Sequence, residues 1–332
     1  MDIWQYLGVQ GRPIFLYGMG NGAELVINEL KKYKITPAGY FASDDFVRGQ
    51  SFNGKRVLKF SEAYINYPDM IALISFGTGR YEVIKNILSL PCEKYAPELP
   101  VVGNVVFNEG FYNNNIGKIN EAETLLFDPE SKRVYRELIE FKLDGKLEHL
   151  LNTQCNEKEY INILNLNGEN YLDLGAYNGD TVIKYAPYCK KITALEPDIK
   201  NFNKLIKNTE DINPICINSA VGEKCCKTEF SFKNGRNSKI GEGTLIDCIS
   251  IDSLNDNFTF IKFDVEGAEC EALSGGRILL KNRKPKLLVS AYHRSEDIFE
   301  IPLLVKSINP DYKISLRRPP HIPAWDVMYL CY

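Results

Sequence analysis

Residues 171–181 read Tyr171-Leu172-Asp173-Leu174-Gly175-Ala176-Tyr177-Asn178-Gly179-Asp180-Thr181. An apolar run that holds one aspartate ends at the first of two glycines, and a helical apolar pattern resumes at Val182 and Ile183. Glycine permits a positive φ, and the start of a helix offers unpaired N–H groups. The stretch therefore predicts a buried strand, a turn and a helix that together cradle a nucleotide-like ligand. Its D-x-G-x-x-x-G spacing is not that of the dinucleotide fingerprint.

Length and composition limit the classes of protein to which this chain can belong. Its 332 residues suggest two domains, and 44% apolar and 25% charged residues are ordinary for a globular protein. A net charge of −3 gives no general attraction to nucleic acid or acidic membranes, and no apolar run approaches the roughly 20 residues of a membrane span. The N-terminus lacks the pattern of a signal peptide, and the nine cysteines form no C-x-x-C pair. We therefore expect a cytoplasmic protein with reduced thiols.

The first third of the chain has the pattern of a small Rossmann-like α/β domain, which we place at residues 1–110. Strands are predicted at 14–17, 37–42 and 71–75, with helices after Gly20 and over 81–90. Gly18-Met19-Gly20-Asn21-Gly22-Ala23 fits G-x-G-x-x-A between the first strand and helix. The right-handed crossover rule makes these strands parallel.

Three functions for this domain stay open. It could bind a mononucleotide or nucleotide sugar, with phosphate at the helix near Gly20 and ribose near Asp44. It could hold NAD, although a complete dinucleotide site needs a second half that is not evident before Pro91. It could also be a docking or oligomerisation domain without a ligand, because a lone G-x-G-x-x-A is weak evidence.

The middle of the chain is predicted to be a helical linker or lid at residues 111–165. The prolines at 91–100 mark a boundary, and 101–107 is expected to be the last strand of the first domain. The Asn- and Gly-rich stretch 108–120 is predicted to be a loop. Helical patterns follow from 121 to 166, including a capped helix over 131–142, and we expect them to cover the mouth of the second domain.

The remaining residues, 166–332, alternate strands and helices and define the fold class. Central strands are predicted at 171–174, 191–195, 215–219, 258–263 and 286–291, with late strands at 312–316 and 327–331. Additional strands or a hairpin are expected at 228–233 and 247–251. This alternation predicts a doubly wound, mostly parallel sheet. Ligands bind such sheets beyond the carboxyl ends of the strands.

An ordered set of motifs stands at these strand ends. After the glycine turn come Glu196-Pro197, Ala220-Val221-Gly222 and Phe260-Ile261-Lys262-Phe263-Asp264-Val265-Glu266-Gly267-Ala268-Glu269. In this order, over about residues 127–332, they resemble the FkbM family of S-adenosylmethionine-dependent methyltransferases, and the glycine turn resembles their motif I. The resemblance implies the class I methyltransferase fold and O-methylation of hydroxyls in sugars, glycans or secondary metabolites.

The resemblance also implies which residues bind the methyl donor. The turn would hold the methionine part, Glu196 would accept the ribose hydroxyls from about 20 residues further on, and Ser219 to Val221 would lie along the adenine. The predicted cofactor-binding residues are Asp173, Gly175, Ala176, Tyr177, Asn178, Gly179, Asp180, Thr181, Glu196, Pro197, Ser219, Ala220, Val221 and Asp264.

Methylation of a hydroxyl calls for a group that accepts its proton. Of the three histidines, only His293 ends a predicted central strand, so it is the predicted base; the alternative is a hydrogen-bonded strand-end residue. Asp264 would position the acceptor or the donor's amino group, and Lys262 could balance its charge. Glu266 is predicted either to act in the active site or to cap the helix that follows.

A metal is not part of the prediction, although Asp264, Glu266 and His293 are a ligand set that suits Mg²⁺ or Mn²⁺. The predicted function is an O-methyltransferase that acts on a sugar, nucleotide sugar or glycan precursor. The first alternative is a nucleotide-sugar or NAD-binding enzyme whose chemistry lies in the N-terminal unit. The second is a binding protein that keeps the fold without turnover.

Overall fold

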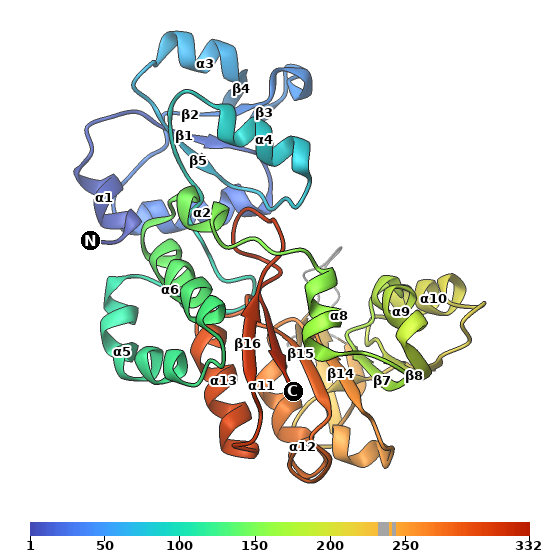
Figure 1. The fold of residues 1–332 in the computed structure, drawn as a ribbon. Helices are drawn as coiled ribbons and strands as arrows, with labels where there is room; N and C mark the ends of the chain where they lie inside the picture. Colours follow the sequence, from blue (N-terminus) through green and yellow to red (C-terminus); the bar gives the residue numbers. More distant parts are fainter. Residues whose placement is uncertain (232–238, 241–243) are drawn as a thin grey trace.

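The computed structural model describes residues 1–231, 239–240 and 244–332 of the chain. The strands form two large sheets and one small sheet. Figure 1 shows the two large sheets at opposite ends of the molecule, with the helices α5 and α6 between them on one side. Among the described residues, no helix combines the length and the apolar character that crossing a bilayer requires.

The first sheet has six strands in the order β3-β4-β2-β1-β5-β6, and every neighbouring pair except β3–β4 is parallel. Its central strands β1, β2 and β5 are buried along their whole length, which explains their unbroken apolar sequences. The strands are β1 (Ile14–Tyr17), β2 (Gly39–Ala42), β3 (Ser51–Phe52), β4 (Lys55–Lys59), β5 (Ile71–Ile74) and β6 (Glu93–Tyr95). Its helices are α1 (Ile3–Val9), α2 (Asn21–Lys32), η1 (Asp44–Phe46), α3 (Phe60–Asn66) and α4 (Tyr81–Ser89).

The last strand of this sheet is not where the sequence predicted it. The described structure has no strand over 101–107; β6 lies at Glu93–Tyr95, within the proline-containing stretch predicted to be a domain boundary. The Glu93 carboxylate accepts hydrogen bonds of 2.6 Å from the hydroxyls of Tyr6 and Tyr95. A charged residue in a three-residue edge strand gives no apolar run, so the pattern did not reveal it.

The loop predicted at 108–120 is also wrong, because α5 (Glu109–Thr124) occupies it. Asn108 caps this helix by accepting a hydrogen bond of 2.9 Å from the N–H of Phe111. Ile119 and Ala122 are buried, and the helix packs against α13. Tertiary packing thus overrides the low helix propensity of the Asn- and Gly-rich sequence. The other helices of this region are α6 (Pro129–Asp144), α7 (Leu147–Leu151) and α8 (Lys158–Leu164).

The second large sheet has seven strands in the order β16-β17-β15-β14-β7-β8-β9. Five of them, from β15 to β9, run parallel, and β17 pairs antiparallel with both β15 and β16. The strands are β7 (Glu169–Leu174), β8 (Cys189–Leu195), β9 (Ile215–Ile217), β14 (Phe260–Phe263), β15 (Lys286–Ser290), β16 (Ile314–Arg317) and β17 (Met328–Cys331). The mostly parallel α/β architecture is therefore confirmed.

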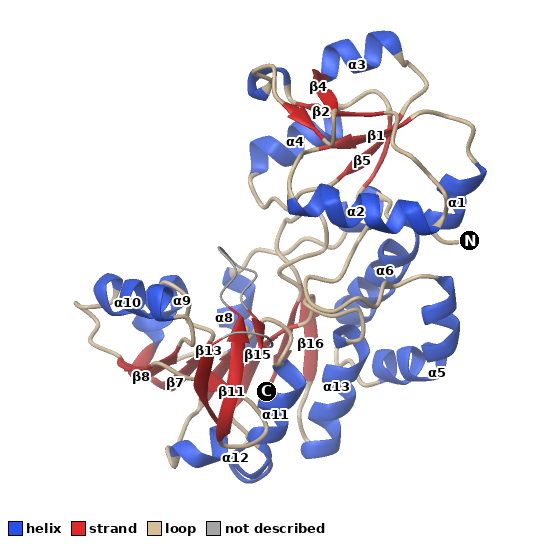
Figure 2. Ribbon diagram, turned by 180° about the vertical axis from the view of Figure 1, so that it is seen from behind, coloured by secondary structure: helices blue, strands red, loops and turns tan. Residues whose placement is uncertain are grey.

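Helices accompany this sheet as Figure 2 shows from behind, where α11, α12 and α13 lie near β15 and β16 and the pair α9 and α10 lies by β7 and β8. They are α9 (Asp180–Tyr185), η2 (Ala186–Tyr188), α10 (Ile199–Asn208), η3 (Ile251–Leu254), α11 (Glu269–Gly275), α12 (Arg277–Arg283) and α13 (Asp297–Ile308). A small sheet of β10 (Ala220–Val221), β11 (Cys226–Ser231), β12 (Lys239–Ile240) and β13 (Thr244–Ile249) completes this half. The last two residues of the predicted strand 228–233 lie outside the described residues.

Candidate active site

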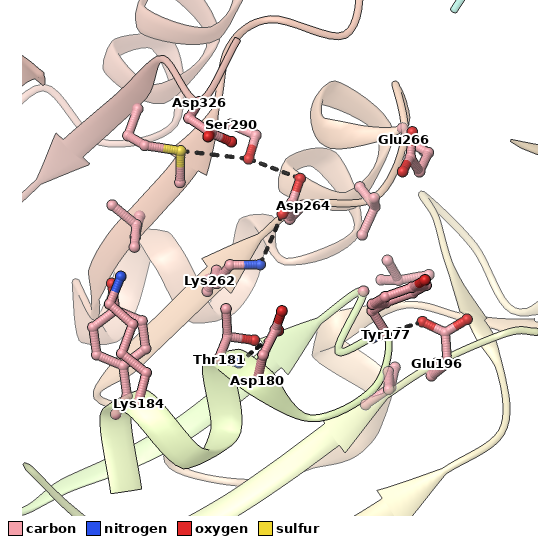
Figure 3. Close-up of a pocket in the computed structure, with 18 of the residues that line it drawn as sticks. Tyr177, Asp180, Thr181, Lys184, Glu196, Lys262, Asp264, Glu266, Ser290 and Asp326 are labelled. Carbon is pink, nitrogen blue, oxygen red and sulfur yellow. Dashed lines mark hydrogen bonds and ion pairs between the residues drawn. The ribbon is translucent and has the colours of Figure 1, made fainter. Parts of the chain in front are cut away.

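A cavity of about 370 Å³ opens beyond the carboxyl ends of β7, β8, β14 and β15, where ligands bind in parallel sheets (Figure 3). This volume suits a small organic ligand. The structure brings together on its wall most of the residues predicted from the sequence: Gly175, Tyr177, Asp180, Thr181, Glu196, Pro197, Ser219, Ala220, Val221, Asp264 and Glu266.

Glu196 ends β8 and is held by backbone donors. One carboxylate oxygen accepts the N–H of Tyr177 at 2.9 Å, and the other accepts the N–H of Asp198 at 2.9 Å. Burial raises the pKa of Glu196 to about 7 because it disfavours the charged form, and these two N–H groups oppose that effect only in part. The carboxylate is thus fixed at the cavity wall with lone pairs left for hydroxyl donors.

Asp173 lies beneath the cavity rather than on its wall. It is fully buried, and its Oδ2 accepts a hydrogen bond of 2.5 Å from the Thr181 hydroxyl. Its Oδ1 is buried without a hydrogen-bond partner, and the Lys262 ammonium lies 3.7 Å from it. Burial raises the pKa of Asp173, against the attraction of Lys262. Asp173 therefore ties the end of β7 to the first turn of α9 and leaves one acceptor oxygen unused.

Gly175 is required by the backbone of the protein itself. Its φ is +80°, and a Cβ at this position would lie 1.9 Å from the carbonyl oxygen of Asp264. The glycine therefore lets the turn after β7 pass directly against the turn after β14. The turn was predicted to need this glycine for its positive φ and to cradle a ligand; the structure adds that the glycine allows the close approach of two strand ends.

Asp264 is the carboxylate at the centre of the cavity wall, as Figure 3 shows. Its Oδ2 lies 3.1 Å from the Lys262 ammonium, and its Oδ1 accepts hydrogen bonds from the hydroxyls of Ser290 at 3.0 Å and Tyr292 at 3.4 Å. Burial alone would raise the pKa of Asp264, but Lys262 and His293 outweigh it and lower the pKa. About a third of the side chain, 31%, is exposed toward the cavity side.

His293 follows β15 and is buried behind Asp264. Its Nδ1 is 2.9 Å from a carboxylate oxygen of Glu269, and its Nε2 is 3.5 Å from Asp264 and 3.7 Å from Glu266. Burial would lower the pKa of the imidazole, but these carboxylates, above all Glu269, raise it to about 10. At neutral pH the ring is therefore an imidazolium that carries a proton on both nitrogens.

Glu269 is a member of this cluster that the sequence analysis did not single out. It is buried, begins α11, and accepts the N–H of Val265 at 2.9 Å as well as facing His293. Glu266, for which capping of this helix was the alternative, lines the cavity, with a φ of 52°. Ligand atoms of Asp264, Glu269 and His293 lie within 4.8 Å of one another, so the set that could hold a cation differs from the predicted one in having Glu269 in place of Glu266.

Several residues of the wall were missed by sequence reasoning. Lys184 comes from the last turn of α9, and Tyr292 from the strand end that also supplies His293. Asp326 and Pro319 come from the segment between β16 and β17, and Glu157 and Tyr160 from the start of α8. Of the helices predicted to lie over the mouth, only this α8 region therefore contributes to the described cavity wall.

Other predicted residues lie off the wall. Ala176 and Gly179 shape the turn, and the Ala176 N–H donates to Leu195 at 2.9 Å. The Asn178 side chain accepts the N–H of Asp180 at 3.2 Å. In the N-terminal domain, Asp44 accepts the N–H of Ser61 at 3.2 Å, at the start of α3.

The mostly parallel sheet, the glycine turn after β7 and the cavity beyond the strand ends define a fold of the class I, Rossmann-like methyltransferase type. Residues 173–309 match the family described as Methyltransferase FkbM domain. This part of the chain is therefore an FkbM methyltransferase domain and the protein is a methyltransferase, a family that implies S-adenosylmethionine as the methyl donor. The resemblance seen in the sequence is confirmed over this range.

Solved structures give a likeness of fold. The crystal structure of methyltransferase FkbM from Methylobacillus flagellatus KT matches with a TM-score of 0.72 and 23% identity, over 99% of this chain and 93% of that one. An rRNA methylase from Streptococcus thermophilus matches with a TM-score of 0.35 and 16% identity, over 56% of this chain and 95% of that one, which supports no conclusion here. A search of curated proteins gave no match.

The cavity fits the donor that the family implies. A carboxylate with spare lone pairs at Glu196 suits vicinal ribose hydroxyls, and Ala220 and Val221 offer an apolar surface nearby. The acidic group of Asp180 suits an ammonium group. The paired Lys184, whose ammonium lies 2.5 Å from Glu157, suits a carboxylate.

Proposed function

We propose that the protein transfers a methyl group from S-adenosylmethionine to a hydroxyl of a sugar, nucleotide sugar or glycan precursor. The observation that carries the proposal is Asp264, an ionised carboxylate on the cavity wall that is backed by a buried imidazolium and a buried lysine. When bound, the donor supplies a methyl group that leaves a sulfonium sulfur for the acceptor oxygen. The protein must hold that oxygen and take its proton.

We infer that Asp264 accepts the hydroxyl proton. Its Oδ1 is already the acceptor for the Ser290 and Tyr292 hydroxyls, so a third hydroxyl can approach the same carboxylate from the cavity. A carboxylate is a weak base, but a hydroxyl oxygen becomes strongly acidic once it gains a methyl group, and the proton then leaves readily. Lys262 and His293 keep the carboxylate ionised before transfer.

The base role predicted for His293 stays a prediction, and its surroundings favour another assignment. An imidazolium has no nitrogen free to accept a proton, and His293 is not among the residues that line the cavity. We propose that the Glu269–His293 pair positions Asp264 from behind. In this arrangement the proton moves to Asp264. The imidazolium of His293 stabilises the negative charge of the Asp264 carboxylate before that proton arrives.

Substitution of Asp264 tests this assignment. We expect Asp264→Asn to lower turnover by about 10²–10⁴-fold, the usual contribution of a positioned proton acceptor, while S-adenosylhomocysteine still binds in calorimetry. Asp211→Asn, which changes an exposed acid, is the matched control and should leave both unchanged. Turnover is measured by mass spectrometry of methylated products from pools of sugars, nucleotide sugars and glycan intermediates. Full activity of Asp264→Asn would refute the assignment.

The same assay tests metal dependence and the donor itself. Since the proposal uses no metal, we expect EDTA treatment to leave turnover unchanged; loss on chelation and recovery with Mg²⁺ or Mn²⁺ would instead favour a cation at Asp264, Glu269 and His293.

We expect Asp173→Ala and Glu196→Ala to abolish binding of S-adenosylhomocysteine. Unchanged affinity in both variants would defeat the donor site.

A further inference from the structure

The segment that joins β16 to β17, residues 318–327, leaves the second sheet and reaches the first one; we call it the strap. Figure 1 shows it, in red, rising from β16 toward the N-terminal half. There it pairs with the turn after β5: the N–H of Thr78 donates to the Ile322 carbonyl at 2.8 Å, and the N–H of Ile322 donates to the Thr78 carbonyl at 2.9 Å. The strap thus occupies a carboxyl strand end of the first sheet.

Side chains fix the strap on both sides. A Cβ at Gly77 would lie 2.1 Å from the ring of Trp325, so the indole packs directly against the backbone of this glycine. The His321 ring stacks on the same indole at 5.5 Å between centroids. At the other end Arg318, fully buried, donates to the carbonyls of Leu150 at 2.7 Å and His321 at 2.6 Å. The strap is therefore a fixed wall rather than a loose loop.

The strap also forms part of the active-site cavity. Pro319 and Asp326 line it, and Asp326 has a φ of 62°, as Glu266 has 52° and Tyr177 has 49°. Such backbone conformations in residues other than glycine are unfavourable and gather at functional sites. Glu196 follows β8 and Val221 ends β10, both at the part of the cavity assigned to the nucleoside of the donor. Met328, two residues after Asp326, pairs with Ser290 of β15, and Figure 3 shows Asp326 near Ser290, on the Asp264 side of the cavity. The strap therefore borders the end of the cavity left for the acceptor.

Charge on the wall is predominantly negative. Its acidic residues are Glu157, Asp180, Glu196, Asp264, Glu266 and Asp326. Its two lysines are both engaged: Lys184 lies 2.5 Å from Glu157, and Lys262 lies 3.1 Å from Asp264. The donor brings one net positive charge, so the acceptor still meets acids in excess. His293 lies behind this wall, 3.5 Å from Asp264 and 3.7 Å from Glu266, and offsets part of their charge. A phosphate beside the reacting hydroxyl would still face Asp326 with like charge.

We propose that the strap is the acceptor wall and that Asp326 is a specificity-determining residue, which selects sugars without negative charge near the methylated hydroxyl, that is, neutral or amino sugars. This inference rests on the proposed function and narrows it. It also gives the N-terminal domain a role, because Gly77 and Thr78 hold the wall in place.

Matched pools of acceptors test the charge preference: hexosamines, neutral hexosides and hexose phosphates, each with S-adenosylmethionine and with acceptor-dependent release of S-adenosylhomocysteine as the readout. We expect the wild-type protein to turn over the phosphate pool at least tenfold more slowly than the other two. Asp326→Asn, whose amide tolerates positive φ, should reduce this ratio several-fold, and Asp326→Lys should reverse it. Asp311→Asn, an exposed acid nearby in the chain, should not change it.

Three results would overturn the inference: a preference for phosphates in the wild type, an unchanged ratio in Asp326→Lys, or no turnover in any pool while S-adenosylhomocysteine binds. Absent binding of S-adenosylhomocysteine would instead refute the proposed function itself.

The contact between the strap and the N-terminal domain is tested separately. We expect Gly77→Ala to raise the KM for the acceptor several-fold without weakening the binding of S-adenosylhomocysteine. Gly11→Ala, where a Cβ meets open space, is its control. Equal effects of the two variants would refute the role of the N-terminal domain.

Discussion

At the scale of single residues, Glu196 links the pH of the solution to donor binding. Burial raises its pKa to about 7, so the group is largely protonated below that pH. A protonated carboxyl has lost acceptor capacity that two ribose hydroxyls would use. Because burial raises the pKa of Glu196 from 4.5 to about 7, the folded state binds a proton that the unfolded state has lost in this range. The free energy of unfolding therefore falls as the pH rises from about 4.5 toward 7. Binding and stability thus change in opposite directions over this window.

We expect the affinity for S-adenosylhomocysteine to rise between pH 6 and pH 8, by up to about tenfold per pH unit below the pKa. Calorimetry across this range measures it. Glu196→Gln should bind weakly at every pH, and Glu210→Gln, which changes an exposed acid, should retain the wild-type profile. A Glu196→Gln profile with the same slope as the wild type would rule out Glu196 as the titrating group.

Single residues were predictable where they follow a strand directly. Glu196 and Asp264 each stand at such an end, and both line the cavity. Asp326 and Lys184 could not be found in this way, because one lies in a connection and the other within a helix. The charge state of His293 was equally hidden, since Glu269 approaches it only through the fold.

At the scale of elements, the turn between β7 and α9 holds the site together through backbone contact. Gly175 lets the ends of β7 and β14 meet, and the Gly175 N–H donates to Leu195 of β8 at 3.0 Å. Three adjacent strands are therefore fixed at one turn. The sequence predicted this turn and its flanking elements, because an apolar strand, a glycine and an apolar helix follow one another without interruption.

Gly175→Ala should destabilise the protein by at least about 1–3 kcal/mol, because alanine is strained at positive φ and its Cβ would meet the Asp264 carbonyl. Denaturant unfolding measures the change. Gly8→Ala is the control: Gly8 lies in α1 with open space around it, and alanine there should be neutral or stabilising by up to about 1 kcal/mol. A neutral Gly175→Ala would mean that the two turns move apart freely.

At the scale of the whole molecule, a buried ion pair connects the two halves. The Lys142 ammonium of α6 donates to Glu98, which follows β6, and both side chains are almost fully buried. Lys142 also lies 5.8 Å from the centroid of the Phe107 ring. Since α6 packs against β16, this pair joins the end of the first sheet to the edge of the second.

Lys142→Met should cost about 3–5 kcal/mol of unfolding free energy, because it leaves the Glu98 carboxylate buried and unpaired. The double variant Lys142→Met/Glu98→Met should recover much of this loss. Arg133→Met, which breaks the exposed pair with Glu130, should cost less than about 1 kcal/mol. A Lys142→Met variant as stable as Arg133→Met would show that Glu98 reaches solvent.

Contacts between the halves were beyond sequence reasoning. Thr78 pairs with Ile322, which lies far from it in the sequence. Neither the sequence around Thr78 nor that around Ile322 predicts this pairing. The helix α5 was missed for a related reason, since its stability comes from α13 rather than from its own composition. Local periodicity predicted the sheets, whereas long-range packing decided how they are joined.

The position of β17 has a consequence for synthesis of the chain. Although it follows β16 in sequence, it lies between β15 and β16 and hydrogen-bonds to both. During translation β16 therefore leaves the ribosome before its partner strand, with only the single bridge between Ile314 and Leu126 on its other side, and β15 keeps one bare edge until β17 arrives. Nascent chains that stall between these two strands would offer two open edges to other molecules, so chaperone demand should peak at this stage.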